Sequence, residues 1–288
     1  MKKSKWGFWA FTGPALFAFI IVQVIPTLMG IYYSFTDWSG VGADKNFVGL
    51  KNYITVFTND SQFFHAFCFT FAFAVCAVIG INVVGFALAL LVTQKFRGAN
   101  LMRGIFFMPN LIGGILLGFT WQFIFVQVFS ALGKKLGIAA LLGWLSNMET
   151  GFIGLLIVQI WQLSGYMMII YIAQLQSIPD SVLEAASLDG AVGFTRLRTI
   201  IMPLMMPAFT IGLFLSISNT FKLFDQNVAL TNGGPANSTQ MIALNIYNTA
   251  FAENKFGLAQ SKAVIFMIIV AVISLIQLNV TKSKEVEM

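Results

Sequence analysis

The chain has 288 residues, of which 58% are hydrophobic and 10% are charged, and its mean hydropathy is +0.82. A soluble domain carries about a quarter charged residues to keep its surface hydrated, so this composition excludes a soluble globular fold and predicts a membrane protein. The net charge of +6 does not predict nucleic-acid binding, because the basic residues are scattered singly rather than gathered into a stripe.

Six stretches are apolar and long enough to cross a bilayer, which takes about 20 residues. We expect spans at residues 8–33, 64–92, 105–129, 151–172, 200–221 and 263–280. The first comes after a lysine-rich start, but its apolar run is longer than the roughly 7–15 residues of a secretory signal, so we expect it to be retained. The predicted fold class is therefore all-α, a polytopic membrane protein with about six transmembrane helices.

The reactive side chains are few and dispersed. Cys68 and Cys76 share the second predicted span and are separated by roughly 12 Å along the helix axis, too far for a disulfide. The only histidine, His65, lies near a helix mouth. These residues form neither a metal site nor a nucleophile–base pair, so intramembrane hydrolysis is not expected.

Basic residues orient the spans, because segments on the cytoplasmic side carry an excess of lysine and arginine. With the N-terminus inside, the inner segments hold Lys2, Lys3, Lys5, Lys95, Arg97, Arg103, Arg196, Arg198, Lys282 and Lys284. The longer outer segments hold Lys45, Lys51, Lys134, Lys135, Lys222, Lys255 and Lys262. The higher charge density inside predicts that both termini are cytoplasmic.

Two outer loops are more than connectors. Residues 35–63 contain an ordered-looking segment at 47–53. The loop at 222–262 contains a turn cluster in which two glycines and a proline force a sharp reversal: Asn232, Gly233, Gly234 and Pro235. Apolar residues at helical spacing come next and predict a short helix: Met241, Leu244, Tyr247 and Phe251.

The inner loop at 177–199 reads as a short helix, a break and a second helix. Pro179 favours a helix start, and Ser181 and Glu184 have the spacing of a capping box. Gly190 is placed to end the helix. The loop also has an apolar ridge that is unusual for a solvated segment and indicates a partner groove: Val182, Leu183, Ala185, Ala186 and Leu188. The residues alone favour docking and purely local capping equally.

This loop and the start of the fifth span together carry a motif: Glu184, Ala185 and Ala186, then Gly190, then Ile200, Met202 and Pro203. The motif resembles the EAA loop of the permeases of binding-protein-dependent ABC importers. Met202 stands where that family usually has leucine, and Leu197 where an aromatic residue is common; both keep apolar bulk. Segments 34–38, 47–53, 103–109 and 231–235 are similar to the carbohydrate-uptake branch, of the maltose and glycerol-3-phosphate type, so the resemblance covers nearly the whole chain.

The resemblance implies a type I ABC importer permease fold, with one permease domain over residues 1–288, in a bacterial cell membrane. It implies that a coupling loop docks on an ATPase subunit through Glu184, Ala185, Ala186, Asp189 and Gly190. It places the outer loop near an extracytoplasmic sugar-binding protein through Asn232, Gly233, Gly234 and Pro235. The implied complex adds a homologous second permease and two ATP-binding subunits. The chain itself is then no enzyme and binds no cofactor, since ATP and magnesium belong to the ATPase subunits.

Energy coupling can be judged from the residues as well. Secondary transporters usually place ionisable groups near mid-membrane, and here none falls deep inside a predicted span. The chain also lacks a phosphate-binding loop of the Gly-x4-Gly-Lys-Ser/Thr type, so ATP must act through another polypeptide. The alternative is a stand-alone secondary transporter of a polar solute, because sodium sites made of carbonyl groups leave no such signature.

A path for an uncharged sugar needs amide, hydroxyl and aromatic groups rather than charges. Gln159, Gln162 and Tyr166 share one face of the fourth span, and Ser216 and Asn219 share a face of the fifth. Hydrogen bonding between helices is the alternative role for any one of them. We expect a cavity lined partly by Gln159, Gln162, Tyr166 and Asn219. Further candidates are two stacking aromatics and a glycine-rich, kinked or closely packed third span: Trp121, Trp161, Pro109, Gly113, Gly114 and Gly118.

Overall fold

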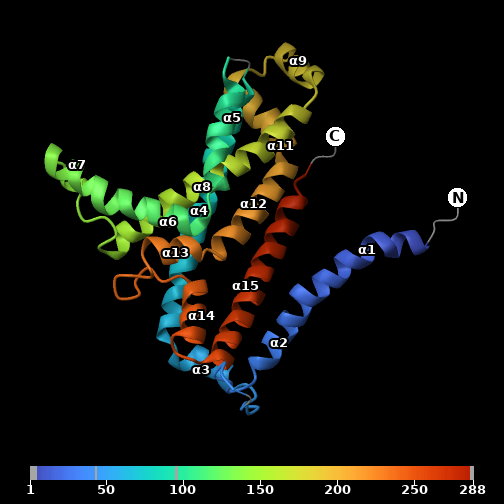
Figure 1. Ribbon diagram of the computed structural model, residues 1–288. Coiled ribbons are helices and arrows are strands. Elements are labelled where there is room, and N and C mark those ends of the chain that lie inside the picture. Colours follow the sequence, from blue (N-terminus) through green and yellow to red (C-terminus); the bar gives the residue numbers. More distant parts are fainter. Residues whose placement is uncertain (1–4, 43, 95–96, 286–288) are drawn as a thin grey trace. The chain divides into compact units, whose positions relative to one another are not determined.

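The computed structural model describes residues 5–42, 44–94 and 97–285, so Lys2, Lys3 and Lys95 lie outside the described residues. Figure 1 labels its helices, which in chain order are α1 Lys5–Phe19, η1 Ile20–Val24, α2 Ile25–Tyr33, α3 Lys51–Asn59, α4 Ser61–Thr93, α5 Ala99–Phe107, η2 Met108–Leu111, α6 Gly114–Phe123, η3 Ile124–Val128, α7 Phe129–Leu136, η4 Ala139–Leu141, α8 Met148–Ser177, α9 Asp180–Leu188, α10 Gly193–Arg196, η5 Leu197–Ile201, α11 Met202–Leu204, α12 Met206–Phe221, α13 Asp225–Leu230, α14 Ile242–Phe251 and α15 Phe256–Lys282. One isolated antiparallel bridge joins Thr36 and Phe47.

The candidate spans agree with the predicted fold class. Five helical stretches among the described residues are long and apolar enough to cross a membrane: Trp9–Tyr33, Ser61–Thr93, Gly114–Leu136, Met148–Ser177 and Phe256–Lys282. A sixth is a bent pair, Gly193–Leu204 with Met206–Phe221, with a bend of 71° between the two helices. The prediction of an all-α chain with about six spans is confirmed.

Two predicted spans are interrupted. The stretch predicted at 105–129 breaks after α5, where η2 contains Pro109 and the backbone is extended at Ile112 before α6 begins. The stretch predicted at 200–221 bends at Met205. Proline is the physical reason in both cases, because it lacks the N–H of the helical ladder. At the second break, Pro207 has no N–H to donate to the carbonyl four residues earlier.

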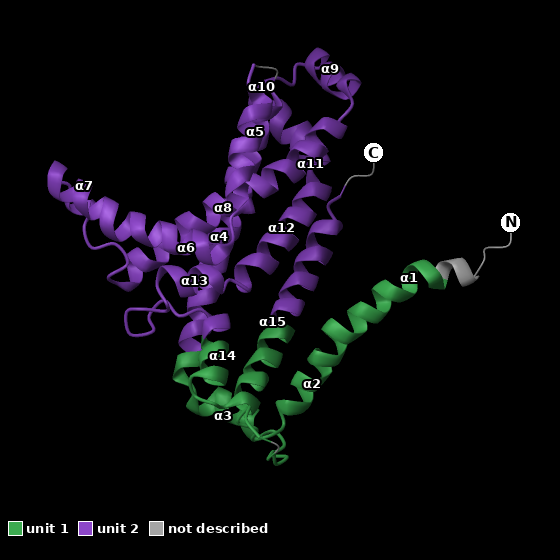
Figure 2. Cartoon of the chain, viewed as in Figure 1, with its two compact units in different colours: residues 1–63, 245–268 green, residues 64–244, 269–288 purple. Residues whose placement is uncertain are grey.

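The chain divides into two compact units (Figure 2), residues 1–63 with 245–268 and residues 64–244 with 269–288. In the first unit, the loop after α2 is ordered by hydrogen bonds to its backbone carbonyls. Asn52 Nδ2 donates to the carbonyls of Ser34 and Thr36, at 2.9 and 2.8 Å. Gly257 N–H, at the start of α15, donates to the Trp38 carbonyl at 2.9 Å. The expected order of the first outer loop is confirmed, while one permease domain over 1–288 stays a prediction.

The second unit is built around α8. More than half of its apolar stretch is buried (56%), against 33% or less in the other four unbent candidate spans. Its inward side chains include Leu155, Val158, Met167, Met168 and Tyr171, each fully buried. The other spans expose many large apolar side chains, which in a membrane protein face lipid or neighbouring helices. This core therefore fixes the positions of the polar side chains on α8.

Candidate functional site

A polar pocket of about 380 Å³ lies within the second unit, formed by η2, α6, α8, α12 and the segment through α13. Three of the four predicted path residues line it: Gln159, Gln162 and Asn219. The sequence did not predict a place in the solute path for the other polar residues of its wall, which are Asn110, Ser218, Lys222, Asp225 and Gln226. For Lys222, Asp225 and Gln226, the sequence indicated only that they are the first polar residues after the fifth span.

Gln162 is held in place by hydrogen bonds at both ends of its amide. Its Nε2 donates to the carbonyl of Ile112 at 3.2 Å, and its Oε1 accepts from Gln226 Nε2. The Ile112 carbonyl is available because the backbone is extended there, outside the helices on either side. Gln162 therefore joins three segments that surround the pocket, and hydrogen bonding between helices accounts for part of its role.

Gln159, one turn away on the same face, has a different environment. Its side chain is only 2% exposed, and no group among the described residues donates a hydrogen bond to its Oε1. A buried acceptor without a donor costs free energy, roughly 1–3 kcal/mol in proteins. Such a group in the wall of a polar pocket is ready to accept a hydrogen bond from a bound molecule.

Asn219 and Tyr166 differ in their positions. Asn219 is exposed, lines the pocket and donates to the carbonyl of Leu215 in its own helix at 2.8 Å. Tyr166 is absent from the wall of this pocket; it is half-buried and packs against the apolar core. It shares the face of Gln159, but seven residues extend about 10 Å along a helix, which carries it beyond the pocket.

Glycines on α6 bring α13 to the pocket. A Cβ atom at Gly114 would lie 2.7 Å from Asp225 Cβ, and one at Gly118 would lie 2.6 Å from Ala229 Cβ. The two glycines are four residues apart and so share one face of α6, which lets α13 approach closely. The close packing predicted for the third span is confirmed, and it places Asp225 and Gln226 in the pocket wall.

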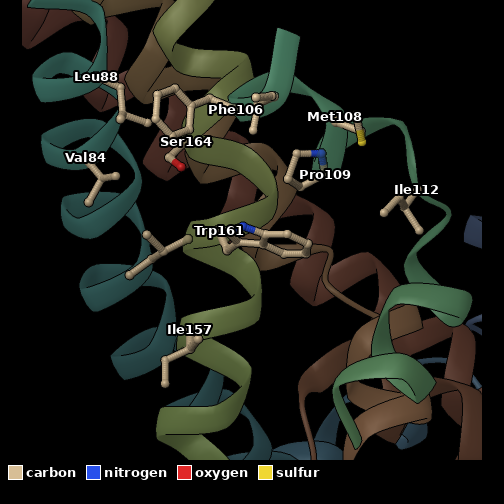
Figure 3. A pocket seen from close by; sticks show the side chains of 11 residues that line it. Val84, Leu88, Phe106, Met108, Pro109, Ile112, Ile157, Trp161 and Ser164 are labelled. Atoms are coloured by element: carbon tan, nitrogen blue, oxygen red, sulfur yellow. The ribbon is translucent and has the colours of Figure 1, made fainter. Parts of the chain in front are cut away.

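A second pocket, of about 620 Å³, is larger but almost wholly apolar (Figure 3). Ile157, Trp161 and Ser164 reach it from α8, and Val84 and Leu88 from α4. Ser164 carries its only side-chain hydroxyl, so the pocket is poorly suited to a polar solute. Trp161 lies here, edge to face with Trp121 at 5.4 Å between ring centroids, and neither indole lines the polar pocket.

The predicted coupling loop contains the short helix α9, which lies at the end of α8 (Figure 1). It ends where Gly190 was expected to end it. Gly190 has a φ of +79°, its N–H donates to the carbonyl of Ser187 at 3.2 Å, and Ala191 N–H donates to that of Ala186 at 2.8 Å. These are the two hydrogen bonds of a Schellman motif, which needs a left-handed residue at this position.

The capping-box prediction for α9 was wrong. The N-cap residue is Pro179, no side chain caps the helix, and Val182 N–H donates to the Pro179 carbonyl at 3.0 Å. Ser181 is therefore already inside the first turn, where its hydroxyl cannot serve as the N-cap. Glu184 is exposed on the surface of α9 and is free to contact a partner.

The exposed surface of α9 combines apolar and acidic groups. Glu184, Ala185, Asp189 and Gly190 are exposed, and Ala186 is buried. Large apolar side chains near them in the chain are also exposed: Leu188 (90%), Phe194 (75%) and Val192 (63%). A hollow of about 570 Å³ beside the helix is lined by Asp180, Leu183, Glu184, Ser187, Leu188 and Arg196.

The turn cluster at 231–235 is ordered by the residues around it. Asn227 is fully buried; its Nδ2 donates to the Thr239 carbonyl at 2.8 Å and its Oδ1 accepts from Met241 N–H at 3.0 Å. Within the turn, Gly233 has a φ of +78°. Asn232 and Pro235 are exposed, Gly234 is half-buried and Gly233 is buried. The reversal and the helix predicted after it, α14, are both confirmed.

The remaining reactive side chains named in the sequence have local partners or lie apart from one another. His65 Nε2 contacts the Ser238 carbonyl at 3.1 Å, and both cysteines are free thiols. Among the described residues, no three His, Cys, Asp or Glu side chains are grouped closely enough to hold a metal ion. Lys262 lies in the second turn of α15, near a helix mouth as expected, and is paired with Asp60.

The chain is similar in sequence to known transport proteins. Residues 81–285 match the family described as "Binding-protein-dependent transport system inner membrane component". The chain is 51% identical over 287 residues to the "Probable starch degradation products transport system permease protein AmyD" of Thermoanaerobacterium thermosulfurigenes, covering 100% of this chain and 97% of AmyD. It is 32% identical over 282 residues to the "Multiple sugar-binding transport system permease protein MsmF" of Streptococcus mutans, covering 98% and 97%.

A solved structure has a similar fold. One chain of a bacterial ABC transporter involved in the import of the acidic polysaccharide alginate superposes with a TM-score of 0.85, over 98% of this chain and 96% of that chain. The two sequences are 19% identical, so the likeness concerns the fold. The matched family region, 81–285, contains both α9 and the polar pocket.

Proposed function

The chain belongs to the family of binding-protein-dependent transport system inner membrane components, and from this premise we propose that it is the permease subunit of an ATP-driven importer of neutral oligosaccharides. As a multi-pass membrane component of a transport system it is not an enzyme. Transport systems of this family depend on a binding protein, as the description of the family says.

The polar pocket is the observation that carries the choice of solute. Its wall presents the amides of Gln159, Gln162, Asn219 and Gln226, groups that donate to and accept from sugar hydroxyls. Gln159 Oε1 is buried and still needs a donor, which a hydroxyl group supplies. The formal charges of Lys222 and Asp225 cancel, which favours an uncharged solute over an acidic one.

The relatives narrow the solute class further. AmyD is named for starch degradation products and MsmF for multiple sugars. Since the chain is 51% identical to AmyD along its full length, glucose oligomers derived from starch are the solutes we put first.

The energy source is inferred from α9. Leu188 on α9 and Phe194 on α10 are exposed apolar side chains, and Glu184 on α9 is an exposed acidic one; such a surface suits a groove on a water-soluble subunit better than bulk solvent. We assign that subunit to the ATPase, with two copies that bind ATP and magnesium and a homologous second permease completing the membrane part. A stand-alone secondary transporter would have no use for this surface.

The proposed orientation has both termini in the cytoplasm. It places α9 on the side of the ATPase and the ordered turn at 231–235 on the side of the sugar-binding protein. The exposed Asn232 and Pro235 of this turn are the residues proposed to lie near the binding protein.

The test is reconstitution in liposomes of the chain with its partner permease, ATPase and binding protein. We expect ATP-dependent uptake of radiolabelled maltose or malto-oligosaccharides and co-purification of the ATPase. Uptake of acidic sugars alone would refute the neutral-solute assignment. Accumulation by the isolated chain without nucleotide would refute the coupling assignment.

A further inference from the structure

A chain of hydrogen bonds crosses three helices of the second unit, outside the wall of the polar pocket. The Tyr171 hydroxyl on α8 donates to Asn82 Oδ1 on α4. Asn82 Nδ2 donates to Ser216 Oγ on α12 at 2.9 Å. Ser216 Oγ donates in turn to the Gly212 carbonyl, one turn earlier in α12, at 2.7 Å. The four groups run in one donor-to-acceptor direction from α8 to α12.

Asn82 is the centre of this network, and its amide oxygen and both amide hydrogens have partners. Besides the two contacts to other helices, Nδ2 donates to the Val78 carbonyl of its own helix at 2.7 Å. One acceptor and two donor hydrogens of the amide therefore all have partners. Tyr171 and Ser216 are fully buried, so each bond is shielded from water.

The contact between α8 and α12 is also fixed by shape. A Cβ atom at Gly212 would overlap the Tyr171 hydroxyl. Three residues along α8 from Tyr171, Gln174 Nε2 donates to the carbonyl of Leu204 at 3.0 Å, just before the bend at Met205. One face of α8 thus contacts α12 and holds the chain at the bend.

The network is one turn from the polar pocket. Ser216 and Asn219 are three residues apart in α12, which corresponds to about 4.5 Å along the axis and about 60° of rotation. Asn219 lines the pocket, while Ser216 is held by Asn82. A rotation of α12 that broke the Asn82–Ser216 bond would turn Asn219 with it.

We propose that Asn82 is a positioning residue for transport: through Ser216 it fixes the rotation of α12 and so keeps Asn219 directed into the solute pocket, with Tyr171 fixing Asn82. The proposal rests on the proposed function of that pocket. Asn82 lies on α4 and does not line the pocket, so its effect on the solute is indirect, and its hydrogen bond to Ser216 is the link to α12.

The first experiment measures uptake kinetics of the reconstituted complex carrying S216A, Y171F or both. We expect the KM for the sugar to rise about three- to tenfold in each single variant, the range of one buried hydrogen bond, with Vmax little changed. The double variant should show less than the product of the single effects, because both changes interrupt one chain through Asn82. The matched control is T210V, since Thr210 Oγ1 donates only within its own helix, to the Met206 carbonyl at 3.1 Å.

The second experiment needs no sugar. In a chain with Cys68 and Cys76 replaced by alanine, Asn219→Cys is labelled with a water-soluble maleimide in the assembled complex. We expect S216A to slow labelling of the introduced thiol about threefold or more, as the loss of one buried hydrogen bond would allow, and T210V to leave the rate unchanged.

The outcomes separate the two proposals. A KM and a labelling rate that are unchanged in S216A would overturn the positioning role, as would equal changes in T210V. Loss of assembled complex and of Vmax in S216A with a normal KM would also overturn it, because that result describes packing alone. If the unaltered complex carries no sugar, the proposed function fails, and the labelling rates alone decide the positioning role.

Discussion

Lys262 Nζ lies 2.7 Å from Asp60 Oδ2, and the two side chains are only 3% and 15% exposed. The lysine also donates to Asn245 Oδ1 at 2.9 Å and to Thr249 Oγ1 at 2.7 Å, so all three of its hydrogens are used. The second oxygen of Asp60 accepts from Phe63 N–H at 2.8 Å, at the start of α4. One buried cation therefore ties α14 and α15 to the first turn of α4 within the first unit.

Breaking this pair from one side should destabilise the protein. Asp60→Asn leaves the ammonium of Lys262 buried without its counter-charge, which typically costs about 3–5 kcal/mol. We expect a clear fall in the Tm of the detergent-purified complex, measured by thermal unfolding.

Two further variants make that measurement specific. Lys255→Met removes an ion pair with Glu253 whose side chains are 59% and 46% exposed, and it should leave the Tm unchanged. Combining Asp60→Asn with Lys262→Met should restore part of the loss, since no unpaired charge remains. A normal Tm in Asp60→Asn would show that the pair contributes nothing to stability.

Gly190 should be replaceable only by residues that accept a left-handed backbone. A Cβ atom there would meet nothing within 4 Å, so the cost of a side chain is conformational, about 1–2 kcal/mol for most residues. Asparagine tolerates this conformation better than valine. We expect uptake and the amount of co-purified ATPase to decrease in the order glycine, Asn, Ala, Val. Equal values for Gly190→Val and the unaltered chain would show that the end of α9 need not be fixed.

Reversing the charge of Glu184 on α9 should weaken the proposed association with the ATPase. Glu184 is exposed among apolar residues, so in the proposed docking on the ATPase Glu184→Lys would put a positive charge where a carboxylate suits a basic residue of the partner. We expect less ATPase to co-purify, or ATP hydrolysis without uptake. Glu149→Lys, an exposed reversal in the first turn of α8, is the matched control and should preserve association. Identical association and coupling in Glu184→Lys would remove Glu184 from the interface.

The parts of the site that were predictable depend on local periodicity. Gln159 and Gln162 share a helical face whatever their surroundings, and Asn219 is polar in an apolar span. Asp225 and Gln226 were missed because they reach the pocket only when α13 packs on the glycines of α6, more than 100 residues earlier in the chain.

Other features depend on distant contacts in the same way. A lone asparagine in the second span, Asn82, carries no periodic signal, and its partners Tyr171 and Ser216 are 89 and 134 residues away. The spans themselves are predictable from composition, and Pro109 indicated a kink in the third span, but the geometry of a break is not predictable in this way. Pro109 and Pro207 mark where a helix can be interrupted, while the bend of 71° at Met205 depends on the packing around it.

Gln159 and Gln162 should respond oppositely to loss of their amides. Gln159→Leu removes a buried acceptor that has no donor among the described residues, so the variant should be at least as stable as the unaltered chain. Gln162→Leu leaves Gln226 and the Ile112 carbonyl without their partner, so its Tm should fall. Both changes are matched in size and in helix, which makes the comparison direct.

Transport should then separate the two roles. For Gln159→Leu we expect the KM for sugar to rise about tenfold while the Tm holds, because a solute hydroxyl loses its acceptor in a site otherwise intact. Uptake assays beside thermal unfolding of the same preparations measure both quantities. A normal KM with a lowered Tm would mean that Gln159 Oε1 has a structural partner in the assembled complex. The amide would then belong to the helix packing, because an acceptor that stabilises the empty protein has no bond left for the solute.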